Sequence, residues 1–143
     1  MTSGEIHDFI GRYIALWENE DVRGLVDCYT PEARVYSPIF HAVEGRKEIE
    51  KSFRDLFAAF GELEITVDDV LIDQESGDRA VFVFTAQQNH RGMLFGMPGT
   101  GRRVETSGAF ILRFENGKIA SDRRIYDFTG LLVQLGILKA KAV

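Results

Sequence analysis

The spacing of the hydrophobic residues divides the chain into a helical first part and an extended second part. Before Gly61 the apolar side chains recur at intervals of three and four residues, which is typical of amphipathic helices. This spacing predicts helices over residues 3–19, 21–29 and 45–60, with a short strand at 33–36. From Glu62 onward apolar and polar residues alternate, and this two-residue period predicts strands.

The clearest strand signal is a hairpin in the last third of the chain. Asn116 and Gly117 lie between two runs of β-branched and aromatic residues, and both tolerate the positive φ angles of tight hairpin turns. We therefore expect strands at 102–114 and 118–128. Another strand is expected at 80–90, after a turn at 75–78. A short apolar helix or turn should follow at 131–138, and residues 139–143 are expected to fray.

One face of this hairpin carries polar groups among apolar ones. Because side chains alternate along a strand, Asp122, Arg124 and Tyr126 share a face. An acid, a base and a phenol on an otherwise apolar face predict the wall of a pocket. The loop at 92–101 is unusually apolar, so we interpret it either as a flap over the pocket mouth or as a loop packed against the core.

The order of the predicted elements favours an α+β fold. In this arrangement a strongly curved antiparallel sheet packs on the three N-terminal helices. Such a sheet forms a cone, whose closed end is core and whose open end can hold a ligand. The chain of 143 residues is expected to form one domain, residues 1–143, because its length suits a single hydrophobic core.

Composition narrows the class of protein. Hydrophobic residues make up 45% and charged residues 27%, which is typical of a globular protein. A net charge of −5 disfavours a nucleic-acid partner, since binding phosphates needs a basic surface. No apolar run approaches the roughly 20 residues of a membrane-spanning helix, and the N-terminus lacks the features of a signal peptide. We therefore expect a cytoplasmic protein with no membrane partner.

The sequence shows no pattern typical of a bound cofactor. Its three histidines lack metal-ligand spacing, and there is neither a glycine-rich phosphate loop nor a serine nucleophile elbow. We therefore expect no metal and no other cofactor. Cys28 is the only cysteine, so it cannot form an internal disulfide, and we interpret it as a buried core thiol.

Several segments resemble those of one known family. They are YIALWENEDVRGLVDCYTPEARVYSP, GRKEIEKSF, GMPGTGRRVETSGAFILRFENGKI and YDFTGLLVQLG. With the order of the elements, they are similar to the nuclear transport factor 2-like superfamily and, within it, to the SnoaL-like polyketide cyclase family. The segments Gly96–Val104 and Asp127–Gly136 carry the motifs that are more specific to that branch. The resemblance covers nearly the whole chain and implies the cone-shaped, cystatin-like fold.

The resemblance also implies a cofactor-independent enzyme that rearranges a mostly apolar, polyketide-like or steroid-like molecule by proton transfer. In the cyclases a histidine and an aspartate act as general acid and base in an aldol closure. His90 matches the histidine, but Arg124 stands at the aspartate position, and a guanidinium cannot shuttle protons near neutral pH. The isomerase pattern is also incomplete. Tyr13 matches its phenol donor, whereas Ser37 stands at its base position and Phe110 at its second oxyanion donor.

These matches define the candidate site. His90 is the candidate acid or base, and Arg124 is the group that would stabilise an enolate oxygen. Tyr13 and Asp122 would act as positioning groups, although Asp122 and Arg124 could equally form a structural ion pair. The candidate ligand-binding residues are Trp17, Tyr36, Phe82, Phe84, Met97, Phe110 and Tyr126.

Two other interpretations stay open at the level of sequence. The first is a non-catalytic module that binds a small apolar ligand in the same pocket. The second is an association domain, in which the cavity is filled by side chains and the open sheet face forms a homodimer. A homodimer is compatible with all three interpretations, and we expect one.

Overall fold

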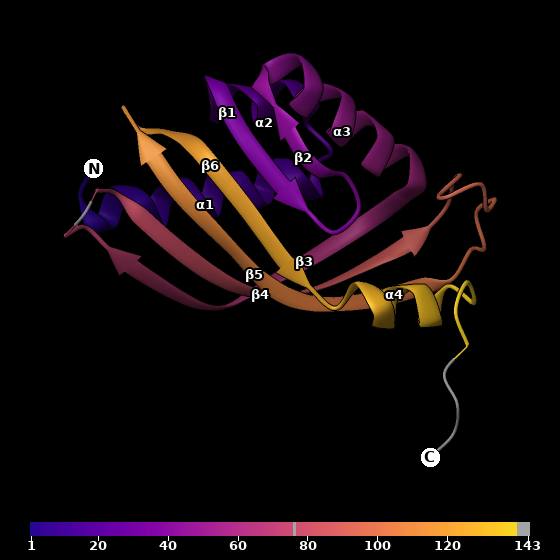
Figure 1. The fold of residues 1–143 in the computed structure, drawn as a ribbon. Helices are drawn as coiled ribbons and strands as arrows, with labels where there is room; N and C mark the ends of the chain where they lie inside the picture. The colour runs from indigo at the N-terminus through magenta and orange to yellow at the C-terminus, as the bar shows by residue number, and fades with distance from the viewer. Residues whose placement is uncertain (76, 140–143) are drawn as a thin grey trace.

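The computed structural model describes residues 1–75 and 77–139 and shows helices packed on a curved six-stranded sheet (Figure 1). The helices are α1 (Ser3–Glu18), α2 (Val22–Asp27), α3 (Gly45–Ala59) and α4 (Phe128–Gln134). The strands are β1 (Tyr29–Ser37), β2 (His41–Glu44), β3 (Phe60–Asp73), β4 (Arg79–His90), β5 (Arg103–Glu115) and β6 (Lys118–Tyr126). The predicted α+β class, with a curved sheet around N-terminal helices, is confirmed.

The sheet is mixed. Its strand order is β2-β1-β6-β5-β4-β3, and every neighbouring pair is antiparallel except β1 and β6, which run parallel. The sequence predicted only antiparallel pairing, because alternation within a strand does not reveal a partner about 90 residues away. Strand β1 is also longer than the predicted 33–36. It spans Pro31 through a register shift between Tyr29 and Arg34, where the missing N–H of proline is tolerated.

The β5–β6 hairpin forms at the predicted place. Asn116 and Gly117 have φ angles of 51° and 75°, as the tight turn requires. Helix α1 begins with a capping box, in which the Thr2 hydroxyl accepts from the Glu5 N–H and the Glu5 carboxylate accepts from the Thr2 N–H. Its buried side chains are those of the predicted apolar stripe: Ile6, Phe9, Ile10, Tyr13, Ile14 and Trp17.

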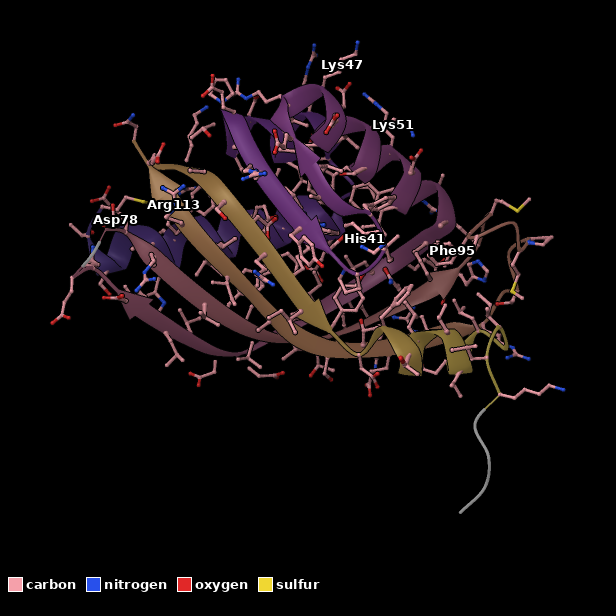
Figure 2. All side chains as sticks on the ribbon, viewed as in Figure 1. His41, Lys47, Lys51, Asp78, Phe95 and Arg113 are labelled. Carbon is pink, nitrogen blue, oxygen red and sulfur yellow. The ribbon has the colours of Figure 1, made fainter. Side chains whose placement is uncertain are left out.

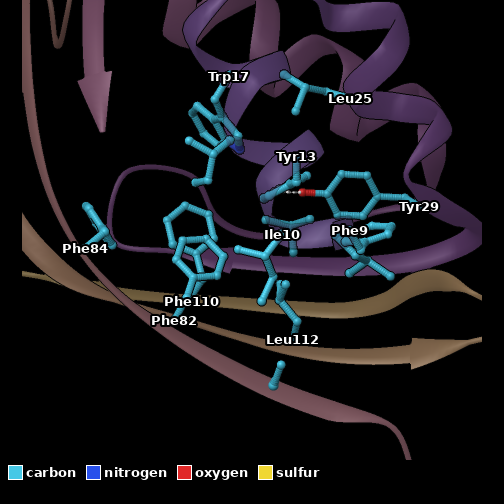
Figure 3. Packing of buried hydrophobic residues seen from close by; sticks show 14 of the residues in the cluster. Phe9, Ile10, Tyr13, Trp17, Leu25, Tyr29, Phe82, Phe84, Phe110 and Leu112 are labelled. Atoms are coloured by element: carbon cyan, nitrogen blue, oxygen red, sulfur yellow. Dashed lines mark hydrogen bonds between the residues drawn. The ribbon is translucent and has the colours of Figure 1, made fainter. Parts of the chain in front are cut away.

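The core consists of two clusters along the length of the sheet. The larger lies between α1, α3 and the concave face of the sheet, and it contains the stacked pair Phe82 and Phe110 (Figure 3). The smaller lies at the end of the sheet where α4 packs, and it includes Phe60, Leu131 and Leu135.

Two predictions fall outside the described residues. The predicted turn at 75–78 includes residue 76, and the predicted fraying concerns mainly residues 140–143. In the described part of the chain, no helix has both the length and the apolar character needed to span a membrane.

Candidate functional site

Four polar side chains meet inside the larger apolar cluster. Asp122 and Arg124 come from β6, Tyr29 from the first position of β1, and Tyr13 from the buried face of α1. Asp122 is 1% exposed and Arg124 is 5% exposed, while both tyrosines are completely buried. Figure 3 shows the two tyrosines joined by a hydrogen bond. We call these four residues the polar network.

The hydrogen bonds of the polar network converge on one carboxylate oxygen. The Tyr29 hydroxyl donates to Asp122 Oδ2 at 2.6 Å, and the Tyr13 hydroxyl lies 3.2 Å from the same atom. Arg124 donates to it from Nε at 3.2 Å and from Nη2 at 2.9 Å. The two hydroxyl oxygens are 2.5 Å apart, and Arg124 Nη2 also donates to the Tyr29 oxygen at 3.2 Å. The partners of the buried ion pair are therefore gathered on one side, around Asp122 Oδ2.

The electrostatics keep Arg124 charged and the two tyrosines protonated. Burial disfavours the charged form of Arg124, but the Asp122 carboxylate and the two tyrosine hydroxyls together raise the pKa of the guanidinium well above its usual range. Burial first, and then the Asp122 carboxylate, raise the pKa of Tyr13 and of Tyr29 well above the usual value for a phenol. Both tyrosines therefore stay protonated donors near neutral pH.

Aromatic rings enclose the guanidinium of Arg124. Its Cζ atom lies 4.9 Å from the centre of the Trp17 ring and 5.3 Å from the centres of the Phe53 and Phe110 rings. These contacts and the bonds to Asp122 fix the plane of the guanidinium. Arg124 Nη1 has no hydrogen-bond partner among the described residues, so it is the donor left for a ligand.

An apolar cavity of about 70 Å³ lies beside Arg124, and we call it the inner cavity. Its walls come from α1, α3, α4, strands β1 and β3 to β6, and the turn at 38–40. The polar residues of its lining are Ser37, Gln88, Thr106, Arg124 and Tyr126. Among the described residues that line it there is no carboxylate and no histidine. Burial raises the pKa of Tyr126 to about 12, so this phenol is a donor at neutral pH.

The structure brings most, but not all, of the predicted site residues together. Trp17, Phe84, Phe110, Arg124 and Tyr126 line the inner cavity. Tyr13 and Asp122 are bonded to Arg124 or to its partners and do not line the cavity.

The remaining predicted ligand-binding residues lie elsewhere. Phe82 stacks on Phe110 in the core, with ring centres 4.6 Å apart. Tyr36 is exposed and lies beneath the guanidinium of Arg123. Met97 belongs to the loop after β4 and does not line the inner cavity.

His90 lies outside the inner cavity, whereas the sequence placed it in the same hollow as Asp122 and Arg124. The side chain is completely buried and packs 5.5 Å from the Phe60 ring. Its Nδ1 accepts the Thr100 N–H at 3.2 Å and lies 3.1 Å from the Thr100 hydroxyl. Phe84 and His90 lie on the same face of β4, but His90 is at the end of the strand, beyond the cavity. The 91–102 loop packs against its side chain there. The role of His90 in proton transfer stays a prediction.

The 91–102 loop packs against the core and does not line the inner cavity. The N–H groups of Arg91 and Gly92 both donate to the Ala59 carbonyl, and the Phe95 ring lies 5.8 Å from that of Phe128. This arrangement agrees with the second of the two sequence interpretations of the loop.

Tyr29 is the network residue that the sequence did not reveal. The helical period assigned it to the buried side of the second helix, but in the structure it opens β1. It pairs there with Ile119, and the Arg46 guanidinium donates to its carbonyl at 2.6 and 3.1 Å. The only local signal was Pro31, which limits how far the preceding helix can extend.

The described residues contain no group of three or more His, Cys, Asp and Glu side chains placed to hold a metal ion. The site that we consider further therefore consists of the inner cavity and the polar network behind it.

Comparisons with known proteins agree with this fold. A family model described as SnoaL-like polyketide cyclase matches residues 7–135. The structure of TsrD from Streptomyces laurentii is 27% identical, with a TM-score of 0.82, and the match covers 96% of this chain and 99% of that one. AclR from Streptomyces galilaeus is 24% identical, with a TM-score of 0.84, and the match covers 99% and 87% of the two chains.

More distant structures share the fold alone. A protein with a ketosteroid isomerase-like fold from Catenulispora acidiphila, in complex with trimethylamine, is 15% identical with a TM-score of 0.75. That match covers 90% of this chain and 92% of the other. No curated protein sequence matches the chain.

Proposed function

Because the chain belongs to the SnoaL-like polyketide cyclase family, we propose that it is a cofactor-independent cyclase or isomerase acting on a mostly apolar carbonyl compound in the inner cavity. The observation that carries this proposal is the environment of Arg124. A guanidinium fixed by Asp122 reaches an apolar cavity with Nη1 uncommitted among the described residues. A hydrogen bond from such a donor strengthens as a carbonyl oxygen gains the negative charge of an enolate.

Each network residue has a defined part in the proposal. Arg124 takes the role of the electrophile and binds the carbonyl oxygen. Asp122, Tyr29 and Tyr13 act as positioning residues, since they hold the guanidinium without reaching the cavity. A buried ion pair is a weak source of stability, and apolar residues of similar volume often replace one without loss. Because Arg124 of this ion pair lines the inner cavity, we assign the pair a role in function rather than in stability.

The absence of a carboxylate and a histidine from the described cavity lining favours a second candidate function. Proton abstraction from carbon needs a base, and Tyr126 is protonated at neutral pH because its pKa is about 12. In the second candidate, the chain binds the same class of ligand without transforming it.

Hydrogen–deuterium exchange at carbon distinguishes the two candidates. The probe is 2-butanone in buffered D₂O, with exchange at its α-carbons followed by proton NMR and binding followed by ligand line broadening. We expect the wild type to bind the ketone and to accelerate exchange, and Arg124→Met to lose both effects. Leu71→Ala, an exposed residue far from the cavity lining, is the control.

The outcomes of this experiment separate clearly. Binding without accelerated exchange would identify the non-catalytic module. Binding that survives in Arg124→Met would contradict the proposal that the guanidinium holds the carbonyl oxygen.

We also propose that the chain forms a homodimer through the outer face of the sheet, away from the helices. Leu71, Val81 and Ile111 are neighbours across β3, β4 and β5, and Leu71 and Ile111 are exposed. The ion pairs Arg79–Asp73 and Arg113–Glu115 flank this row. An apolar centre with a charged rim is typical of surfaces that bind another protein.

A further inference from the structure

Strand β6, which carries Arg124, pairs with β1 over a shorter length than with β5. Pairing of β6 with β1 extends only to Tyr36 and Arg123, whereas pairing of β6 with β5 continues to Tyr126. After Ser37 the chain leaves the sheet through Pro38, which has no N–H to donate to a ladder. Within the described residues, positions 124–126 of β6 therefore have a strand neighbour on one side only.

A second hollow lies on the other side of this edge. This outer groove has a volume of about 440 Å³, and the residues that line it alone are Tyr36, Pro38, His41, Phe95, Arg123, Ile125 and Phe128. Figure 2 shows His41 and Phe95 at the end of the molecule where α4 lies. Ile39, Arg124 and Tyr126 line both the outer groove and the inner cavity. Strand β6 runs between the two hollows, and the side chains of Ile39, Arg124 and Tyr126 separate them beyond the end of β1.

The outer groove has the character of a site for a flat apolar group. Phe95 packs edge-on against Phe128, and the two rings form one wall. Tyr36 forms another, with the guanidinium carbon of Arg123 5.0 Å from the centre of its ring. Phe95 is 57% exposed and has a φ of 49°, a conformation that aromatic residues rarely adopt. The backbone thus holds a large apolar ring at the surface.

The volumes show why the inner cavity needs an extension. About 70 Å³ is less than the roughly 150 Å³ of a cavity that holds a single benzene ring. Pockets that bind drug-sized molecules measure about 300–1,000 Å³. The inner cavity alone accommodates a carbonyl group and a few neighbouring atoms, whereas both hollows together fall within the usual range.

We propose that the outer groove is the second half of one ligand site. The carbonyl end of the ligand binds Arg124 in the inner cavity. Its aromatic tail passes between Ile39 and Tyr126 and lies against Tyr36 and Phe95. The ligand class is therefore an elongated ketone or ester with a flat apolar tail. This inference rests on the proposed function, because it assumes that Arg124 binds the carbonyl oxygen.

Two ketones with the same head test the inference. The probe 2-butanone has the carbonyl head alone, and 4-phenyl-2-butanone adds an aromatic tail; their dissociation constants are measured by NMR titration. For the wild type we expect the longer ketone to bind at least about tenfold more tightly, since burying a phenyl ring typically gains that much. Phe95→Ala, or Tyr36→Ala as a second variant, should remove most of this gain and leave 2-butanone unchanged.

The controls separate this inference from the proposed function. Met93→Ala changes a side chain of the same loop that is 62% exposed but does not line the groove, and it should affect neither ketone. Arg124→Met should weaken both. Equal wild-type affinities for the two ketones, or an unchanged gain in both groove variants, would overturn the inference while leaving the proposed function intact.

Two further results would also decide the question. The proposed function, and this inference with it, would be overturned if Arg124→Met does not weaken the binding of 2-butanone. The same holds if the wild type binds neither ketone. If Phe95→Ala dissociates a dimer in sedimentation velocity, the groove is a contact between two copies of the chain, and the inference is wrong.

Discussion

At the scale of single residues, the geometry around Asp122 determines what the site can do. One carboxylate oxygen accepts from two phenols and from the guanidinium, while Oδ1 is buried without a partner in the described residues. This one-sided arrangement holds Arg124 firmly and leaves Nη1 as the donor available to the cavity. In the proposed function, Asp122 would therefore act on a ligand only through Arg124.

Removing Asp122 should destabilise the protein strongly. We expect Asp122→Ala to lower the free energy of unfolding by about 3–5 kcal/mol, because it leaves a buried guanidinium without its counter-ion. The double variant Asp122→Leu with Arg124→Met should recover most of that loss but should not bind the ketone. The control Asp55→Ala breaks an exposed ion pair with Lys51 and should cost less than about 1 kcal/mol. Urea unfolding measures all three, and a near-native stability of Asp122→Ala would contradict this account.

Alkaline pH should destabilise the folded chain through its buried tyrosines. Burial raises the pKa of Tyr126 to about 12, and burial and Asp122 raise the pKa of Tyr13 and Tyr29 further. The unfolded chain releases these protons near pH 10, so the stability they contribute is complete below about pH 10 and is lost as the pH rises toward 12. We expect Tyr126 alone to account for about 2 kcal/mol of this loss.

Urea unfolding between pH 9 and about pH 12 measures this effect, and Tyr126→Phe should make the decline shallower. Phenolate absorbance gives an independent readout, because Tyr13 and Tyr29 should ionise only when the chain unfolds. Ionisation of all tyrosines in a chain that still shows native circular dichroism would refute the assignment.

At the scale of elements, local sequence predicted what depends on local geometry. The period of apolar residues located α1 and α3, and the Asn116-Gly117 pair located the hairpin turn. Strand β2, the parallel pairing of β1 and the place of Tyr29 in the network were missed. Each of these depends on which distant segment lies alongside, and neither alternation nor turn residues carry that information. The same limit explains His90, whose surroundings are set by the loop that folds over it.

The contact between β5 and β6 next to the cavity depends on a glycine. A Cβ atom at Gly108 would lie 2.0 Å from the Ile125 carbonyl oxygen and 2.7 Å from the Tyr126 Cβ. We expect Gly108→Ala to displace Tyr126 from the wall between the two hollows and to destabilise the chain by about 2 kcal/mol. A Cβ atom at Gly11 on α1 would meet no atom of another described segment within 4 Å, so Gly11→Ala should stabilise the chain by about 0.5–1 kcal/mol.

Thermal unfolding of both glycine variants gives the comparison. The two substitutions add the same methyl group, so opposite signs would show that the close approach of β6 matters at position 108. Destabilisation of similar size at both positions would argue against that explanation.

At the scale of the whole molecule, the two faces of the curved sheet have different surroundings. The concave face packs on α1 and α3 and encloses the inner cavity (Figure 1). The size of that cavity and the short edge of β1 next to it follow from the way distant strands meet, so the sequence could not predict them. The opposite face leaves an apolar row across β3, β4 and β5 that the proposed dimer would cover.

A charge placed in this row should separate the proposed dimer. Ile111→Glu would place a carboxylate at the β5 end of the apolar row, where a partner surface would remove it from water, and removing a charge from water is costly. We expect sedimentation velocity to give a dimer for the wild type and a monomer for Ile111→Glu at the same concentration. Met93→Glu adds the same charge at an exposed position on the 91–102 loop and should leave the dimer intact. A wild-type monomer, or a dimer that tolerates Ile111→Glu, would mean that this face has another role.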